Sequence, residues 1–411
     1  MLAGEGCRLA PAPCHLAAPS PGRPEISARQ EASRCGRYHV RNTPAIRPAR
    51  AGHGLAAALT PPPAAGKEST MDLIVVGAGW AGEAHVKAAK ALAAEGADCR
   101  VAALVDVDAD HLARTSAEWA IPNTYTSLAA AVRSCAADAV VLATPHHLHR
   151  QGTELAAAAG RHVLVEKPMA LTLDDADAMI DACRRAGVCL MVAESARFHR
   201  SNLVAREALS AGKIGQLLSG RINAITRGRH TYMYPGRRAW LADPSICGGG
   251  IWMLNGIHDM SVARMLLGEP VRIYAREVHS EKFQSPLEAT IVALISFAGG
   301  AEISMTVSAE LHGYKRFGDI VLFGSEGTLY LRRQDAAEVV IHTEGGTEAI
   351  DCADDDRGDA RGAFVRQMEE FASAVAEKRQ PATAGRSERK TLAAILAGYE
   401  SVRTGAPVEL C

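Results

Sequence analysis

The sequence predicts an α/β protein in which a doubly wound parallel sheet is followed by an α+β domain with a large, mainly antiparallel sheet. Two observations predict this order. In residues 71–194, short apolar runs alternate with helical stretches, which is typical of parallel strands joined by right-handed crossovers. In residues 195–411, strand-like runs follow one another with short Gly-containing connections, which is typical of antiparallel pairing.

Composition sets the class of protein. The chain has 411 residues, enough for two domains, and its 48% hydrophobic and 22% charged residues are ordinary globular usage. A formal net charge of -1 gives no reason to expect nucleic acid or an anionic membrane surface as partner, and no apolar run is long enough for a membrane-spanning helix. The ten cysteines show neither CxxC pairs nor zinc spacing, so we expect reduced thiols in a cytoplasmic protein.

Residues 1–70 differ from the rest of the chain. They are rich in proline, and their nine Lys and Arg residues outnumber four Glu residues. We therefore expect a disordered N-terminal extension. The segment lacks the apolar core of a secretory signal; a mitochondrial transit peptide fits the arginines, although the prolines fit an amphipathic helix poorly. We favour the interpretation that Met71 is the true start.

A glycine-rich turn lies between the first predicted strand and the first predicted helix. The turn reads Gly77-Ala-Gly79-Trp-Ala-Gly82. Gly77 permits a tight turn, Gly79 lets the backbone approach a pyrophosphate, and Gly82 lets the helix pack closely on the strand. The N–H groups of Trp80 and Ala81 would then meet the phosphates at the positive end of the helix.

An acidic residue follows the second predicted strand. Asp106 lies 24 residues beyond Gly82, near the spacing of about 20 that is typical of dinucleotide-binding domains. A carboxylate there accepts hydrogen bonds from the adenosine ribose and repels a 2′-phosphate, and no arginine adjoins it, so we expect NAD, with NADP less favoured. The simpler alternative is an ordinary strand-to-helix turn with Asp106 as a helix cap. The order of strand, glycines, helix, strand and acid favours a Rossmann domain that binds NAD.

The alternation of strands and helices continues to residue 194. The predicted strands are 72–76, 100–105, 139–143, 162–165 and 188–192, and the predicted helices are 83–95, 148–159 and 173–186. In such a sheet, ligands bind beyond the carboxyl ends of the strands. The segments that fall there are Thr144-Pro145-His146 and Glu166-Lys167-Pro168.

Several motifs of the chain are those of one family. They are Gly77-x-Gly79-x-x-Gly82-x-x-His85, Ala143-Thr144-Pro145 with His149, Val165-Glu166-Lys167-Pro168, Gly248-Gly249-Gly250 followed by Gly256-x-His258, and Thr404-Gly405-Ala-Pro407-Val408. Over nearly all of residues 71–410 the chain thus resembles the glucose-fructose oxidoreductase / inositol dehydrogenase / rhizopine catabolism (Gfo/Idh/MocA) family of NAD(P)-dependent oxidoreductases. The resemblance implies a Lys167-Pro168 bond that is often cis. It also implies a cofactor site that includes Thr144, Pro145, His146, His149, Glu166, Lys167 and Arg197.

Lys167 and His258 are the candidate catalytic residues that the resemblance implies. An ammonium at Lys167 can hydrogen-bond a substrate hydroxyl and stabilise the alkoxide-like charge that grows as hydride leaves. His258 can take the hydroxyl proton near neutral pH as a general base. The alternatives are a surface lysine paired with Glu166 and a histidine that only packs in its helix.

The sequence departs from the family four residues before His258. Relatives that oxidise sugars and cyclitols usually carry an Asp there, whereas this chain has Leu254. Asn255, three residues before His258, would lie on the same helical face, so we expect its side-chain oxygen to orient the imidazole. An amide supplies no negative charge, which leaves room for a second hypothesis, an NAD-binding sensor or regulator without turnover.

A loop beyond residue 226 combines aromatic rings with guanidinium groups. We expect Tyr232, Arg237 and Trp240 to bind substrate together with Lys167 and His258, because aromatic rings stack on sugar rings and guanidinium groups bind carboxylates. The alternative is an exposed loop with solvated arginines. The triplet His146-His147-x-His149 suggests a metal site, but no carboxylate or thiol lies nearby in sequence, so we expect no metal.

The second domain is expected to carry one broad sheet. Its predicted strands are 218–226, 271–278, 289–297, 301–308 and 319–323, and its predicted helices are 249–267, 361–378 and 387–402. So few helices can cover only one sheet face, and the other is expected to be a homo-oligomer interface, as in relatives. The leading hypothesis is an NAD-dependent oxidoreductase that transfers hydride between nicotinamide and a secondary alcohol or ketone of a sugar, cyclitol or cyclic diol.

Overall fold

The computed structural model describes residues 71–96, 99–226, 236–278, 280–281, 285–310, 316–332, 338–352 and 361–410. The predicted N-terminal extension, residues 1–70, lies outside the described residues, as does Tyr232. Within the described part of the chain, no helix is both long and apolar enough to cross a membrane.

Six parallel strands form the first sheet, in the order β3-β2-β1-β4-β5-β6. They are β1 (Met71–Val76), β2 (Cys99–Val105), β3 (Thr124–Tyr125), β4 (Ala139–Leu142), β5 (His162–Glu166) and β6 (Leu190–Ala193). The order reverses between β1 and β4, which is the point where ligands bind in doubly wound sheets. Strand β1 is buried along nearly its whole length, as expected for a parallel strand covered on both faces.

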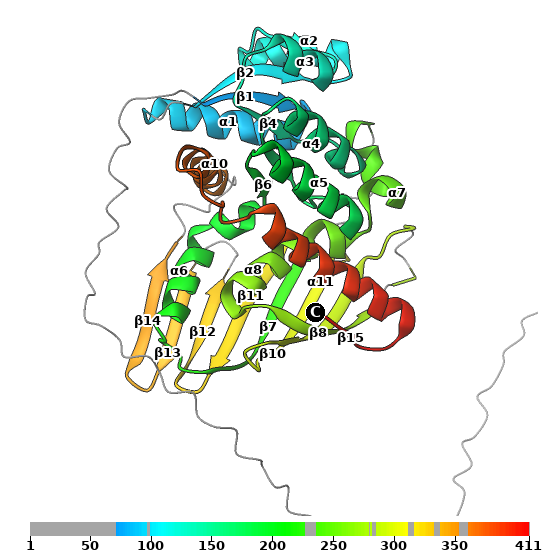
Figure 1. The fold of residues 1–411 in the computed structure, drawn as a ribbon. Helices are drawn as coiled ribbons and strands as arrows, with labels where there is room; N and C mark the ends of the chain where they lie inside the picture. The colour runs from blue at the N-terminus through cyan, green and yellow to red at the C-terminus, as the bar shows by residue number, and fades with distance from the viewer. Residues whose placement is uncertain are drawn as a thin grey trace, which may run out of the picture. The chain divides into compact units, whose positions relative to one another are not determined.

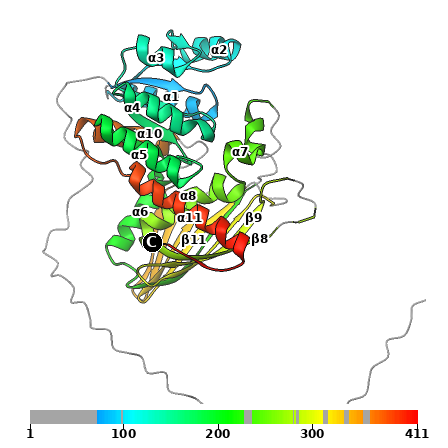
Figure 2. The ribbon, with the colours of Figure 1, turned by 45° about the vertical axis from the view of Figure 1, so that its right-hand side comes forward.

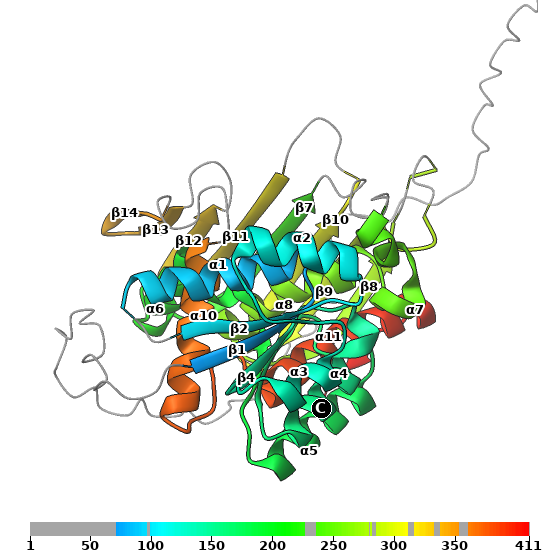
Figure 3. The same cartoon turned by 90° about the horizontal axis from the view of Figure 1, so that it is seen from above.

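Helices cover both faces of this sheet. They are α1 (Trp80–Ala94), α2 (Ala109–Trp119), α3 (Leu128–Ser134), α4 (His149–Ala158) and α5 (Leu173–Ala186). Figure 3 shows α1 and α2 on one side of β1, β2 and β4, and α3, α4 and α5 on the other. In helix α5 the residues at both ends explain its bounds. Thr172 caps the first turn by accepting a hydrogen bond from Asp175 N–H, and Gly187 ends the helix in the left-handed conformation.

Nine strands form the second sheet, in the order β14-β13-β12-β11-β7-β10-β9-β8-β15. Only the central pair β7 and β10 is parallel among the strands described. The strands are β7 (Leu217–Thr226), β8 (Pro270–Glu277), β9 (Thr290–Phe297), β10 (Glu302–Ser308), β11 (Arg316–Gly324), β12 (Gly327–Arg332), β13 (Glu338–Thr343), β14 (Gly346–Asp351) and β15 (Val408–Glu409). This confirms the predicted fold class, an N-terminal parallel sheet followed by a mainly antiparallel one.

One face of the second sheet is covered. Helices α6 (Arg200–Ser210), α8 (Ile257–Leu267) and α11 (Gly385–Thr404) lie on it, as Figures 1 and 2 show. Strand β9 alternates accordingly, with Ile291, Ala293 and Ile295 buried and Val292 and Leu294 exposed on the opposite face. A further helix, α10 (Arg361–Ala376), returns from the second half of the chain to pack on α1 of the first sheet.

The structure adds elements that the sequence patterns do not reveal. Helices α2, α3, α6 and the short α7 (Pro244–Cys247), and strands β3, β12, β13, β14 and β15, lie outside the predicted ranges. The predicted helix at 249–267 is also not uniform, because Trp252–Gly256 forms a π-helical turn, η6, before α8 begins. Such turns carry one extra residue per turn and are common at functional sites.

Candidate functional site

The glycine-rich turn after β1 has the geometry that its residues predict. Gly77 has a φ of 101°, and a Cβ on it would lie 2.3 Å from the carbonyl oxygen of Ala143 at the end of β4. A Cβ on Gly82 would lie 1.9 Å from the Gly77 oxygen, so any side chain there would separate helix from strand. Gly79, in contrast, has nothing within 4 Å of its Cβ position, and Trp80 is exposed. The turn therefore leaves open backbone at the start of α1, where an anion is favoured.

Asp106 lies at the carboxyl end of β2 beside this turn. Its carboxylate accepts hydrogen bonds from the N–H groups of Ala78 (2.9 Å) and Asp108 (3.0 Å), and from Arg237 Nη2 (2.6 Å). Burial would raise the pKa of Asp106, but these hydrogen bonds and the Arg237 charge hold it below its ordinary range. The group is thus a carboxylate at neutral pH, as the sequence analysis requires.

Glu166 links the two family motifs of the first sheet. Its Oε1 lies 2.8 Å from Nε2 of the fully buried His85 on α1, and its Oε2 accepts a hydrogen bond from Lys167 N–H (3.2 Å). Phe364 of α10 packs edge-on against the His85 ring, at 5.2 Å between ring centroids. These contacts explain the histidine that lies three positions after Gly82. His85 fixes the end of β5 relative to α1.

The loop after β4 is held by two histidines. His146 donates from Nδ1 to the Cys247 carbonyl (2.8 Å), and its ring meets that of Trp240 nearly at right angles, at 4.8 Å. His149 is fully buried, with its ring nitrogens 2.9 Å from Pro168 O and 3.0 Å from Thr144 O. Burial lowers the pKa of His149, and a neutral ring can donate to only one of these carbonyls.

His149 has no exposed area, so the structure supports a role in positioning this loop, and its membership of the cofactor site stays a prediction. Thr144 and Pro145, by comparison, are half-buried at the end of β4.

Lys167 follows β5 and has a cis peptide bond to Pro168, which confirms that expectation. Its Nζ donates to the carbonyl oxygen of Leu254 in the π turn η6, at 2.6 Å. Burial lowers the pKa of Lys167, and the carboxylates of Glu194 and Glu166 oppose the shift. A carbonyl in the π turn can receive this bond because the widened turn interrupts the regular helical hydrogen-bond pattern.

His258, the first-turn residue of α8, is fixed by Glu194. Its Nδ1 lies 2.5 Å from Glu194 Oε1. Since a carboxylate can only accept, Nδ1 carries the hydrogen and Nε2 of the neutral ring is left as an acceptor. The Glu194 side chain is fully buried, whereas that of His258 is 28% exposed, so the ring joins the interior to a surface that a ligand can reach.

Glu194 is an anion although it is buried. Burial alone would raise its pKa, but the charge and hydrogen bond of His258, the charge of Lys167 and the Ala196 N–H hold the pKa of Glu194 below its ordinary range. Lys167, Glu194 and His258 therefore form one electrostatic group, called here the Lys167 cluster.

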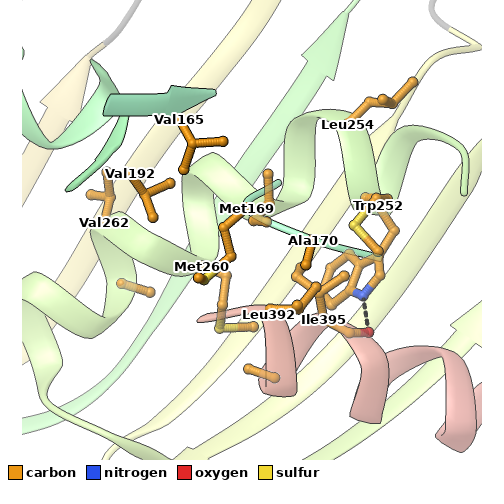
Figure 4. Packing of buried hydrophobic residues seen from close by; sticks show 14 of the residues in the cluster. Val165, Met169, Ala170, Val192, Trp252, Leu254, Met260, Val262, Leu392 and Ile395 are labelled. Carbon is orange, nitrogen blue, oxygen red and sulfur yellow. Dashed lines mark hydrogen bonds between the residues drawn. The ribbon is translucent and has the colours of Figure 1, made fainter. Parts of the chain in front are cut away.

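An apolar core fixes this group. Figure 4 shows Val165, Met169 and Ala170, which flank Lys167 in the sequence, packed with Trp252 of the π turn η6, with Met260 and Val262 of α8, and with Leu392 and Ile395 of α11. The Trp252 indole donates to the Ile395 carbonyl at 2.9 Å. Close packing of this kind fixes the position of the strand end relative to the helix.

A second buried carboxylate caps the helix. Glu288 accepts hydrogen bonds from the N–H groups of Gly250 (2.7 Å) and Trp252 (3.0 Å) and from the Tyr399 hydroxyl (2.6 Å). Negative charge at a helix N-terminus is stabilising. The glycines that precede η6 allow this approach, because a Cβ on Gly250 would lie 2.3 Å from the Glu288 carbonyl oxygen.

The prediction that Asn255 orients His258 is wrong. The ring nitrogen of His258 that needs an acceptor is bonded to Glu194, and no hydrogen bond among the described residues joins Asn255 to it. The prediction used the spacing of a regular α-helix, whereas Asn255 lies in the π turn. An extra residue per turn rotates positions that are three apart off a common face.

Two arginines of the predicted site contact other elements of the chain. Arg197 is half-buried, with its Nε 3.4 Å from Ser261 Oγ and its Nη2 3.9 Å from Glu388 Oε1, so it joins η3 (Ser195–Phe198) to α8 and α11, and its predicted contact with the cofactor stays a prediction. Arg237 reaches Asp106 and not the Lys167 cluster, which corrects its assignment to the substrate.

Sequence reasoning missed Glu194 and Glu288. Glu194 directly follows β6, so the rule that ligands bind beyond the carboxyl ends of parallel strands could have found it. No local signal marks Glu288, since its partners lie on other elements. Among the described residues, no group of three or more His, Cys, Asp or Glu side chains could hold a metal ion.

Two family models match the chain. One, described as an oxidoreductase family with an NAD-binding Rossmann fold, covers residues 71–194, and the other, described as a GFO/IDH/MocA C-terminal domain, covers residues 203–330.

Known proteins resemble it over most of its length. D-apiose dehydrogenase of Paraburkholderia graminis is 30% identical, over 82% of this chain and 88% of that protein. Myo-inositol 2-dehydrogenase of Thermotoga maritima is 26% identical, over 81% of this chain and 96% of that protein. A solved structure of levoglucosan dehydrogenase in complex with NADH has a TM-score of 0.76 at 22% identity, over 83% of this chain and 99% of that one, which shows a shared fold.

Proposed function

This chain belongs to the GFO/IDH/MocA family of oxidoreductases with an NAD-binding Rossmann fold, and we propose that it is an NAD-dependent dehydrogenase of a sugar, cyclitol or cyclic diol. Hydride would pass between nicotinamide and a secondary alcohol or the corresponding ketone. The observation that carries the proposal is the Lys167 cluster. It brings a half-buried ammonium and a carboxylate-bound imidazole together at the carboxyl edge of the parallel sheet.

The residues at that edge fit a dinucleotide. Gly77, Gly79 and Gly82 shape the turn. The N–H groups of Trp80 and Ala81 lie at the start of α1, where they would bind the pyrophosphate. Asp106 would accept hydrogen bonds from the adenosine ribose. Open space at the Cβ position of Gly79 supports close approach of a pyrophosphate. Thr144, Pro145, His146, Glu166 and Lys167 continue this surface from β4 to β5. NAD supplies the hydride chemistry when bound.

Lys167 would bind the reacting oxygen of the substrate. An ammonium has three donors, and one is used on Leu254 O, which holds the side chain in place while two remain. The lysine charge stabilises negative charge on the substrate oxygen, and the effect is large because the site is buried.

His258 would take the hydroxyl proton at Nε2. The bond to Glu194 keeps the hydrogen on Nδ1, and the Glu194 charge stabilises the imidazolium that forms. Glu194 thereby supplies the negative charge that the Asp of relatives would supply at the position of Leu254. The missing Asp was the reason to consider a sensor without turnover. The contact of Glu194 with His258 therefore favours an enzyme over a sensor.

Incubation of the protein and NAD with sugars, inositols, uronic acids and cyclic diols tests the proposal. We expect at least one of them to give the absorbance of reduced nicotinamide, since the named relatives act on a pentose and an inositol. Trp240 beside His146 would contribute an aromatic face for such a ring. No turnover over the whole panel, with NAD demonstrably bound, would contradict the dehydrogenase and favour the sensor.

The second sheet would form a homo-oligomer. On its open face Val292, Leu294 and Phe323 are 42%, 51% and 44% exposed, and burial of these side chains against a second copy of the chain would favour association. Sedimentation of the purified chain tests this, and a monomer at all concentrations would contradict it.

We further propose a cytoplasmic location, because the six described cysteines are free thiols. A domain boundary near residue 194, after β6, fits this division of roles.

A further inference from the structure

Arg237 brings a positive charge to the residue that selects the cofactor. It lies in η5 (Gly236–Ala242), 131 positions beyond Asp106 in the sequence. Its Nη2 donates to Asp106 Oδ2 at 2.6 Å, and its Nη1 donates to Asp108 Oδ2 at 3.0 Å. One guanidinium thus spans both carboxylates at the end of β2.

The segment that carries Arg237 is anchored at two further points. The Trp240 ring contacts His146, and the Cys247 carbonyl accepts a hydrogen bond from the same histidine. Both contacts are with the loop after β4, next to β1 in the sheet. The segment that carries Arg237 is therefore held against the first sheet. This restricts the position from which the arginine reaches Asp106.

The charges at this end of the site are balanced. A lone Asp106 would repel a 2′-phosphate, which is the usual basis for preferring NAD. Here two carboxylates face Arg237, and the charge of Arg114 also acts on Asp108. Only one donor bond from the guanidinium goes to each carboxylate, and the Arg237 side chain is 43% exposed. Its remaining N–H groups are available to an anion.

We propose that Arg237 binds the 2′-phosphate of NADP, so that this protein accepts NADP as well as NAD. Asp106 binds the ribose hydroxyls in NAD, and Arg237, already held by Asp106 and Asp108, receives the phosphate oxygens in NADP. Guanidinium groups bind phosphate with two parallel hydrogen bonds, and an arginine near the acidic residue is the known means of accommodating a 2′-phosphate. This inference rests on the proposed cofactor site but not on the identity of the substrate.

Titration calorimetry on the full chain tests the inference without turnover. The probes are adenosine 5′-monophosphate and adenosine 2′,5′-bisphosphate, which differ only in the 2′-phosphate and lack nicotinamide. We expect Arg237→Gln to weaken the bisphosphate by roughly 10- to 100-fold relative to the monophosphate, the effect of losing a charged hydrogen-bonding group. Arg237→Lys should recover part of the loss, because it keeps the charge but not the paired donors.

Arg133→Gln is the matched control, since it removes an exposed arginine of the same sheet unit that has no hydrogen bond to Asp106 or Asp108 among the described residues. It should leave the ratio of the two affinities unchanged. Equal effects of Arg237→Gln on both nucleotides, tighter binding of both, or no binding of either to the unmutated protein would overturn the inference. Failure of the substrate panel would not affect these outcomes, so the two proposals fail separately.

Discussion

The two ends of the proposed cofactor site each have a buried carboxylate, Glu194 or Asp106, but they differ in how exposed the charged groups around that carboxylate are. The Lys167 cluster joins an ammonium, a carboxylate and an imidazole, and its carboxylate, Glu194, has no exposed area. At the other end Asp106, Asp108 and Arg237, called here the Asp106 cluster, pair two carboxylates with a guanidinium. There Asp108 and Arg237 are 46% and 43% exposed.

The difference predicts how each end responds to substitution. A buried charge that loses its partner stays unsolvated, and breaking such a pair costs about 3–5 kcal/mol. An exposed ion pair is worth about 0–1 kcal/mol, because water replaces the missing partner. We therefore expect substitutions in the Lys167 cluster to change the rate and its pH dependence, and substitutions in the Asp106 cluster to change nucleotide affinity and selectivity.

The largest effect is expected for Lys167→Ala. It removes the donor to the reacting oxygen, and the loss of one such buried donor lowers kcat by about 10²- to 10³-fold. NAD affinity, measured by calorimetry, should change much less, because the pyrophosphate and adenosine contacts remain. Lys213→Ala, at a surface pair with Glu348, is the control. Equal loss of turnover and of NAD affinity would contradict the catalytic role of Lys167.

Glu194→Gln should lower kcat by about 10²-fold and shift the pH profile. General-base catalysis contributes about 10²- to 10⁴-fold, and the amide keeps the shape but removes the charge that stabilises the imidazolium. The Glu194 charge also favours the ammonium of Lys167, whose pKa burial already lowers. Its removal lowers the pKa of Lys167 further, so the alkaline limb of the rate profile should move to lower pH.

The control for this change is Glu207→Gln on α6, an exposed carboxylate that carries the same change of charge. It should leave both the rate and the profile as they are. An alkaline limb that moves to higher pH in Glu194→Gln, or does not move, would show that Glu194 does not act on Lys167.

Asp106→Ala is expected to weaken NAD binding by about tenfold, the effect of losing one charged hydrogen-bond acceptor whose neighbours Asp108 and Arg237 are open to water. It should not move the pH profile, because the Lys167 cluster lies at the other end. Binding of NAD by calorimetry measures the loss, with the exposed Asp181→Ala on α5 as control. Unchanged affinity would mean that the adenosine ribose does not meet Asp106.

The smallest effect is expected for Asn255→Ala. Its side chain has no role in orienting His258, so kcat should fall by less than about twofold, as for most substitutions away from a structural or catalytic contact. Steady-state kinetics measures kcat of Asn255→Ala and of Glu194→Gln under the same conditions. A loss as large as that of Glu194→Gln would restore Asn255 as the residue that orients His258.

Most of the first sheet and half of the site could be predicted. The strand from Met71, the turn at Gly77 and the acid at Asp106 are contiguous in sequence, and local geometry demands those residue types. The second sheet was predicted from five strands, and β12, β13, β14 and β15 were missed. Asn255 was assigned by helical spacing, and the π turn invalidated that spacing. The hydrophobic periodicity of the sequence does not mark this π turn, in which Trp252 contacts the distant Ile395.

The sequence by itself determined the family motifs, the cofactor turn, and the positions of Lys167 and His258 on their elements. These follow from backbone requirements and periodicity, which act over a few residues. Only the tertiary structure decided what those groups touch. Glu194 meets His258 across 64 residues, and Arg237 meets Asp106 across 131. The physical reason is that the charge state and the direction of a side chain depend on all the elements packed around it, and elements distant in sequence become neighbours only when the chain folds.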